Sequence, residues 1–199
     1  MAGMDDGAVR LMTFDPTSRS WTKKPRVLRH HRTAVLSLAV IHAGGGAVVG
    51  VSGSTDGCVA LFNAGEDPPS RGEEGVVWVK ELHQSGINGC EVCPAADIWG
   101  EGFHSGAGGE SWCVVTAGDD EAVSLITVRV QQGDAGGGLQ VLDDRRWRRE
   151  GVHGSTIRGL CLCGGVVFTV GADQRVVGLM PRTDKVLFRV TCEVNFELI

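Results

Sequence analysis

Short apolar runs alternate with small polar turns along almost the whole chain. Around Asp56, for example, the run Val48 to Val51 leads into Asp56-Gly57, and a second apolar run follows from Val59 to Phe62. Short β-branched runs bounded by glycine predict strands, and an Asp-Gly pair between two of them predicts a tight antiparallel turn. The pattern therefore predicts an all-β protein built of small antiparallel sheets.

The same pattern occurs three times in one register. Each copy opens with a histidine, has a β-branched residue four positions later (Val35, Ile87 or Ile157), and carries an aspartate after a buried apolar run. Apolar residues follow each aspartate at the third and sixth positions, as expected for a strand entering a core. The repeat positions are His31 and Asp56, His83 and Asp120, and His153 and Asp173.

The repeat divides the chain into units. Asp6 to Met12 matches Asp56 to Phe62 step for step, so the chain is expected to open in the second half of a repeat. Residues 1–30 are predicted to form this truncated unit and a connector. The predicted full units are residues 31–82, residues 83–152 with glycine-rich insertions at 97–110 and 133–138, and residues 153–192, with residues 193–199 beginning another strand.

Composition and charge narrow the picture. The 199 residues include 30 glycines and 27 valines, which excludes a helical bundle. A net charge of −5 argues against binding of nucleic acid through the overall charge of the protein, so any such contact would involve a local basic segment. No apolar stretch is long enough for a membrane span, and the first residues do not predict a secretory signal. Seven scattered cysteines then indicate reduced thiols and a cytoplasmic location.

The repeat resembles that of the WD-repeat β-propeller family, whose four-stranded blades carry a histidine near the start and an aspartate between the second and third strands. The resemblance implies a β-propeller fold of about three and a half blades, in which His31, His83 and His153 pair with Asp56, Asp120 and Asp173 in buried networks that hold the turns. The sequence departs from the family pattern where a Trp-Asp pair would close each blade, because Phe62-Asn63, Ile126-Thr127 and Leu179-Met180 stand there.

Two short segments resemble one branch of that family more closely. They look like segments of the large WD-repeat proteins that act as non-catalytic partners of the FtsJ-type tRNA 2′-O-ribose methyltransferase. The matching residues are His83, Gln84, Ser85, Gly86, Ile87 and Asn88, followed by Asp173, Gln174, Arg175 and Val176. The resemblance covers residues 82–180, about half of the chain. It implies a scaffold that supports methylation of the tRNA wobble nucleotide, with the methyltransferase and tRNA as partners and the methyl donor held by the partner.

Two basic segments are candidate RNA contacts. Both precede a histidine that opens a repeat, so loops of two blades could display them on one face. Arginines beside an aromatic ring suit phosphate contact and base stacking. The alternative is an outer strand whose arginines pair with Asp143, Asp144 and Glu150. The candidate residues are Lys23, Lys24, Arg26, Arg29, Arg32, Arg145, Arg146, Trp147, Arg148 and Arg149.

Other patterns do not predict a cofactor, a metal site or catalysis. Cys90 and Cys93 have zinc-ligand spacing, but they and the Cys161–Cys163 pair fall in strands, where small side chains pack between blades. The glycines at 44–46 lack the spacing of a nucleotide-binding loop. No nucleophile motif is complete, so the sequence does not predict an enzyme.

Two functions remain open. One is the tRNA-modification scaffold, and the other is a general WD-repeat module for protein interaction in signalling, trafficking or ubiquitin-ligase assembly. Because a propeller needs about four to eight blades to close, the chain is expected to be part of a longer protein.

Overall fold

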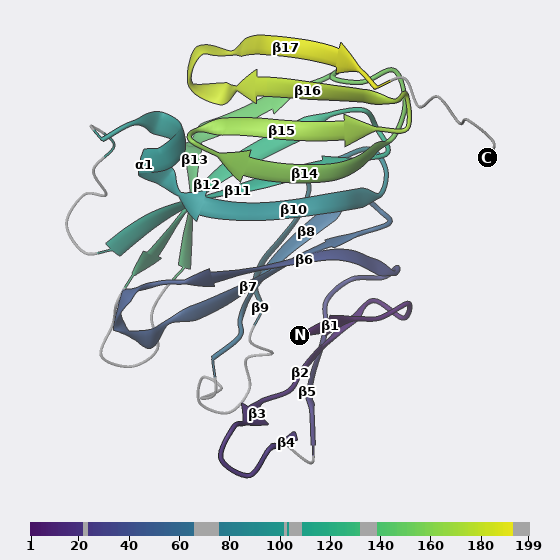
Figure 1. Cartoon of the computed structure of the whole chain (residues 1–199). Helices are drawn as coiled ribbons and strands as arrows, with labels where there is room; N and C mark the ends of the chain where they lie inside the picture. The colour runs from purple at the N-terminus through teal and green to yellow at the C-terminus, as the bar shows by residue number, and fades with distance from the viewer. Residues whose placement is uncertain (22–23, 66–75, 102, 104–108, 132–138, 193–199) are drawn as a thin grey trace.

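The computed structural model describes residues 1–21, 24–65, 76–101, 103, 109–131 and 139–192. These residues form an all-β molecule of four larger antiparallel sheets, which follow one another in chain order, and one two-stranded sheet (Figure 1). The sheet of residues 2–29 and the sheet of residues 157–191 lie at opposite ends of the arrangement.

The first sheet has three strands, and a small hairpin extends from it. Its strands run in the order β1 (Ala2–Gly3), β2 (Ala8–Leu11) and β5 (Arg26–Arg29). The hairpin between β2 and β5 pairs β3 (Phe14–Asp15) with β4 (Ser20–Trp21).

The other three sheets each have four strands, paired in chain order. The second contains β6 (Val35–His42), β7 (Val48–Ser54), β8 (Cys58–Asn63) and β9 (Val76–Glu81). The third contains β10 (Ile87–Pro94), β11 (Gly109–Gly118), β12 (Val123–Gln131) and β13 (Leu139–Arg149). The fourth contains β14 (Ile157–Cys163), β15 (Val166–Gly171), β16 (Arg175–Met180) and β17 (Lys185–Thr191).

Helical segments are short. They are η1 (Gly44–Gly46), α1 (Ala95–Trp99) and η2 (Pro181–Thr183). The insertion expected to start at residue 97 as a loop begins instead within α1, where Ile98 is buried against the third sheet. Among the described helices, none is long and apolar enough to cross a bilayer.

The hydrophobic core lies between the sheets. The innermost strands β6, β10 and β14 are neighbours, so successive sheets stack face to face around one side of the molecule. Val51 and Leu61 of the second sheet pack with Val114 and Ile126 of the third. The opposite face of the third sheet packs on the fourth in the same way, which buries the middle strands on both faces.

Each repeat aspartate lies in the turn between the second and third strands of a four-stranded sheet. Asp56 separates β7 from β8, Asp120 separates β11 from β12, and Asp173 separates β15 from β16. The fold therefore places the three aspartates at one end of the three sheets, next to the histidine that precedes each inner strand.

Candidate functional site

A buried hydrogen-bond network holds the Asp120 turn. His83 Nδ1 lies 2.8 Å from Asp120 Oδ1, and His83 Nε2 lies 2.9 Å from the Thr116 hydroxyl. Because an ionised carboxylate can only accept, Nδ1–H is the donor to Asp120. Burial lowers the pKa of His83 despite the carboxylate nearby, so the ring is neutral at pH 7 and Nε2 accepts from Thr116.

The Asp173 turn is built in the same way. His153 Nδ1 lies 2.8 Å from Asp173 Oδ1, and Nε2 lies 2.9 Å from the Thr169 hydroxyl. In both networks the second carboxylate oxygen accepts a backbone N–H at 2.9 Å, from Gln84 for Asp120 and from Gly154 for Asp173. These side chains are engaged in holding the turns, which is a structural role.

The hydroxyl members of the networks were not identified in the sequence, although a signal for them exists. Ser52, Thr116 and Thr169 each stand four residues before the aspartate of their repeat, and each is buried. A small hydroxyl residue in an apolar strand, repeated at one position, indicates a buried hydrogen-bond partner.

The first repeat departs from this arrangement. His31 Nε2 lies 2.8 Å from the Ser52 hydroxyl, which His30 Nε2 also contacts at 2.9 Å. Asp56 instead accepts from the Ser54 hydroxyl and the Cys58 backbone N–H. The pairing of His31 with Asp56 that the resemblance implies is therefore missing from the hydrogen bonds between described residues.

His30 gives this repeat a second imidazole, which is partly buried. Its ring lies 4.6 Å from the His31 ring and 5.2 Å from the Phe62 ring. Burial, and next the proximity of His31, lower the pKa of His30 to about 4. Burial also lowers the pKa of His31, so both histidines are neutral at pH 7.

The segment of residues 83–88 joins neighbouring sheets. The Asn88 amide Nδ2 donates to Asp119 Oδ1 at 2.7 Å and to the Ile157 carbonyl at 3.0 Å, which links the third sheet to the fourth. The Ile87 carbonyl accepts from the Ser37 hydroxyl of the second sheet, and the Ile87 side chain is fully buried. The Gly86 carbonyl accepts the Asp119 N–H at 2.8 Å.

Gln84 and Ser85 complete that segment on the surface side. Gln84 is exposed and contributes its backbone N–H to the Asp120 network, while Ser85 lies beside Gly57 of the preceding turn.

The segment of residues 173–176 forms the turn between β15 and β16. In this turn Gln174 adopts a positive φ of 60° and the Arg175 N–H donates to Asp173. The Arg175 side chain is exposed at the start of β16.

The basic residues lie on strands, so the expectation that loops display them is wrong. Arg26 and Arg29 are at the two ends of β5, and residues 145–149 complete β13. Because β5 and β13 are the outer strands of the first and third sheets, the two groups are separated by the second sheet. Lys24 and Arg32 are exposed beside β5, and Lys23 lies outside the described residues.

Several of these arginines have partners within the protein. Arg148 donates to Asp120 at 3.0 Å, to the Ser124 hydroxyl at 2.8 Å and to the Leu82 carbonyl at 2.6 Å, so it extends the Asp120 network to the outer strand. Burial alone would raise the pKa of Asp120, but the hydrogen bonds from His83, the Gln84 N–H and Arg148 outweigh it and hold that pKa below its usual value.

Asp184 is a further partner that sequence reasoning missed. The Trp147 indole N–H donates to Asp184 at 2.9 Å, and Arg149 donates to the same oxygen at 3.0 Å. These contacts tie the outer strand of the third sheet to the turn before β17. The sequence has no signal for them, since the residues are 35 and 37 positions apart. Arg146 is exposed on the same strand, and Arg145 is placed by its backbone position alone.

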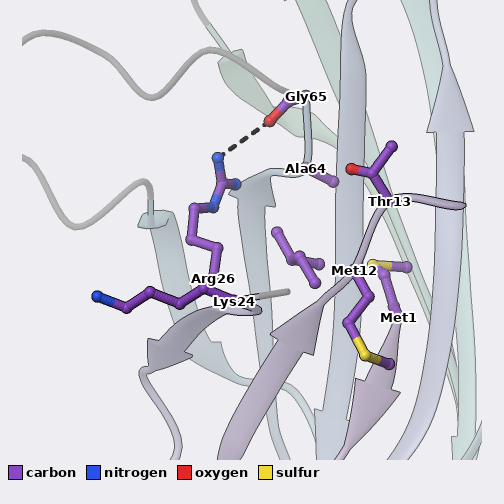
Figure 2. Close-up of a pocket in the computed structure, with 8 residues that line it drawn as sticks. Met1, Met12, Thr13, Lys24, Arg26, Ala64 and Gly65 are labelled. Atoms are coloured by element: carbon purple, nitrogen blue, oxygen red, sulfur yellow. Dashed lines mark hydrogen bonds between the residues drawn. The ribbon is translucent and has the colours of Figure 1, made fainter. Parts of the chain in front are cut away.

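A small pocket lies between the first two sheets (Figure 2). It encloses about 170 Å³ and is lined by Met1, Met12, Lys24, Arg26 and neighbouring residues. The Arg26 guanidinium donates to the carbonyls of Asn63 and Gly65 and so forms one wall of the pocket. Arg29, at the other end of β5, forms an ion pair with Asp6 at 2.7 Å.

The cysteines are free thiols. Cys93 and Cys113 face each other across β10 and β11, and a hydrogen bond between their thiols raises the pKa of Cys93. Within the described ranges, no three His, Cys, Asp or Glu side chains lie close enough together to hold a metal ion.

Comparisons with known proteins bear on the fold. No protein-family model matches the sequence, and no curated protein matches it. Solved structures do match. The Chaetomium thermophilum Sqt1 bound to the N-terminus of the ribosomal protein L10 matches with a TM-score of 0.60 and 13% identity over 95% of this chain and 44% of that chain.

Two further solved structures match this chain over a similar range. The WD40 β-propeller domain of Doa1 has a TM-score of 0.59 and 17% identity, over 96% of this chain and 49% of that one. A chain of the mitotic checkpoint complex has a TM-score of 0.58 and 15% identity, over 94% of this chain and 46% of that one. The chain thus spans less than half the length of these structures. Together with the stacked four-stranded sheets and the His–Asp turns, these similarities show that the chain adopts the WD40 β-propeller fold.

Proposed function

We propose that this chain is a non-catalytic scaffold that binds other macromolecules through the surfaces of its sheets. The observation that carries the proposal is that the His83–Asp120 and His153–Asp173 pairs are engaged in holding turns of the fold. The neighbours support this use of the fold, since one was solved bound to a ribosomal protein segment and another is part of a checkpoint complex.

The specific form of the proposal is a scaffold for 2′-O-methylation of the tRNA wobble nucleotide, located in the cytoplasm. Its support is the resemblance of residues 83–88 and 173–176 to the non-catalytic partners of the FtsJ-type methyltransferase. In this proposal the methyltransferase is the protein partner and carries the methyl donor. The outer strand β13 is the candidate tRNA contact, because Arg145, Arg146 and Arg149 lie on it beside Trp147.

A tRNA mobility shift tests the RNA contact. The variant changes Arg145, Arg146 and Arg149 to Glu and keeps Arg148, because Arg148 supports the Asp120 network. The expected result is at least a tenfold weaker tRNA affinity and a shallower dependence of affinity on salt, since phosphate contacts are lost. The matched control changes the exposed Arg19, Arg158 and Arg189 to Glu, which alters the net charge equally.

Equal tRNA affinity in the two folded variants would contradict the proposed contact.

Protein partners are tested separately by capturing the endogenous protein with an antibody and identifying what is recovered with it. Recovery of an FtsJ-type methyltransferase supports the tRNA scaffold. Recovery of unrelated signalling, trafficking or ubiquitin-ligase proteins would favour the general interaction module instead.

A further inference from the structure

Two cysteines lie directly opposite each other inside the third sheet. Cys93, near the end of β10, is the cross-strand partner of Cys113 on β11, and both side chains belong to the core between the third and fourth sheets. Opposite residues of an antiparallel pair have Cα atoms about 4.5 to 5.5 Å apart, inside the range of about 4.4 to 6.8 Å that a disulfide spans. The backbone therefore holds the two cysteines at a separation that a disulfide can bridge.

Hydrogen-bond donors around the pair are directed at the Cys113 sulfur. The Trp99 indole N–H donates to the Thr127 hydroxyl oxygen at 3.1 Å, so the hydroxyl hydrogen can be donated to the Cys113 sulfur, 3.8 Å away. The hydrogen bond from the Cys93 thiol, and next those from Thr127 and Trp99, hold the pKa of Cys113 below its ordinary value despite burial. These donors favour the thiolate form, which is the form that attacks another sulfur.

A cavity between the third and fourth sheets reaches Cys93. It encloses about 140 Å³ and is lined by Cys93, by Asp97 and Ile98 of α1, and by residues 162–165 of the β14–β15 hairpin. One water molecule takes up about 30 Å³, so the cavity has room for a molecule the size of hydrogen peroxide. Cys93 is 9% exposed, whereas Cys113 has no exposed surface. Cys93 is therefore the sulfur that such a molecule meets first.

We propose that Cys93 and Cys113 form a redox-sensitive modification site, which hydrogen peroxide converts to a disulfide. The Cys93 sulfur attacks one peroxide oxygen, so that an S–O bond forms, the O–O bond breaks, and the thiol proton leaves with the departing oxygen as water. The Cys113 sulfur then attacks the Cys93 sulfur. The S–S bond forms, the S–O bond breaks, and the hydroxyl leaves with the Cys113 proton as a second water. The two thiols lose two electrons and the peroxide gains them.

The disulfide changes the connectivity of the chain at one place. It closes residues 94–112, which include α1, into a covalent loop anchored on the third sheet. Disulfides that form in reducing compartments are transient and serve redox sensing, so the bond is a reversible lock on this loop. The site uses none of the arginines on β13 and none of the His–Asp turns, and it does not depend on the proposed scaffold function.

Peptide mapping of the purified chain tests the proposal. Reduced protein is treated with hydrogen peroxide, the remaining thiols are blocked in denaturant with N-ethylmaleimide, and the chain is cleaved after glutamate. Cleavage places Cys93 in residues 92–101 and Cys113 in residues 111–121, each without another cysteine. The two fragments are expected to be joined, roughly tenfold more often than any other pair of cysteines, because the fold holds these thiols together. Dithiothreitol is expected to separate them.

Variants and unfolding supply the controls. Cys113→Ala is expected to remove the link and to leave Cys93 as a sulfenic acid, which dimedone traps. Cys90→Ala is the matched variant, because Cys90 is also buried on β10 but packs with the second sheet, so the link is expected to remain. Protein unfolded in urea before treatment is expected to lose the preference for this pair.

Three results would overturn the proposal. The first is oxidation of the exposed Cys161, Cys163 and Cys192 while Cys93 and Cys113 stay reduced. The second is a link formed mainly between Cys93 and Cys163, which lines the same cavity. The third is an equal yield of the Cys93–Cys113 link in the urea-unfolded chain. None of these results bears on tRNA affinity or on the recovered protein partners, by which the scaffold function is tested.

Discussion

The aspartates of the repeat turns accept different sets of hydrogen bonds. Asp120 accepts from an imidazole, a backbone N–H and a guanidinium, whereas Asp56 accepts from one hydroxyl and a nearby backbone N–H. The first repeat also differs in having two histidines, His30 and His31, that share Ser52, whereas no second histidine precedes His83. The family resemblance implied three His–Asp pairs, and the structure has two of them, at Asp120 and Asp173.

Asp120→Ala is expected to lower the free energy of unfolding by about 3 kcal/mol, because three buried or partly buried donors lose a charged acceptor. Asp56→Ala is the matched variant, with an expected loss of about 1 kcal/mol. Urea unfolding of both variants measures the difference. Equal losses would show that the His83 network adds nothing to the turn.

The neutral state of His30 predicts a pH dependence. Its pKa is about 4 in the folded protein, below the ordinary value of 6.5, so the unfolded chain takes up a proton first as the pH falls. The stability from neutral His30 is complete above pH 6.5 and is lost progressively as the pH falls from 6.5 to 4. His30→Phe is expected to flatten unfolding curves measured across this range. The exposed His42→Asn should keep the steep slope.

At the scale of elements, alternation and turn residues were sufficient to predict the strands and the Asp turns. They were not sufficient in segments where the residues show no strand or helix period. Four arginines around Trp147 show no apolar alternation, so residues 145–149 were expected in a loop, with an outer strand as the alternative. The structure has the outer strand, in which Trp147 is partly buried against the core. Helix α1 has five residues, too few for a helical period to appear in the sequence.

The turns also differ in backbone strain. The residue after the aspartate has a positive φ in every turn, and it is Gly57 in the second sheet but Glu121 and Gln174 in the third and fourth. Gln174→Gly is expected to raise the free energy of unfolding by about 1 kcal/mol, because the left-handed conformation then costs nothing. Ala172→Gly, in the same turn without a positive φ, is expected to destabilise.

Thermal or urea unfolding distinguishes these variants. The reciprocal change Gly57→Gln is expected to destabilise strongly, since a Cβ there would lie 2.1 Å from the His83 carbonyl oxygen. A loss of stability in Gln174→Gly would show that the Gln174 side chain contributes more than the strain it imposes.

At the scale of the whole molecule, the sheets are stacked in a row, so each is stabilised by its immediate neighbours. The third sheet is covered on both faces, whereas the first has three short strands and a small core around Val9, Leu28 and Phe62. This difference could not be read from the repeat, which looks alike in each copy.

Hydrogen exchange is expected to follow this order. Backbone amides of β11 and β12 should exchange at least tenfold more slowly than those of β2 and β5, because opening the first sheet exposes far less apolar surface. Mass spectrometry of peptic fragments from the native protein measures the two regions in one experiment. Equal protection would mean that all four sheets open as a single cooperative unit.

The outer strand of every sheet has one edge without a neighbouring strand among the residues described, and these strands carry much of the positive charge. Arg26 and Arg29 lie on β5, Lys80 on β9, residues 145–149 on β13, and Arg189 on β17. Lysines and arginines on free edges keep other strands from adding to a sheet. The same arginines that are candidate RNA contacts therefore protect the protein from aggregation, and replacing them by neutral residues would reduce its solubility whatever they bind.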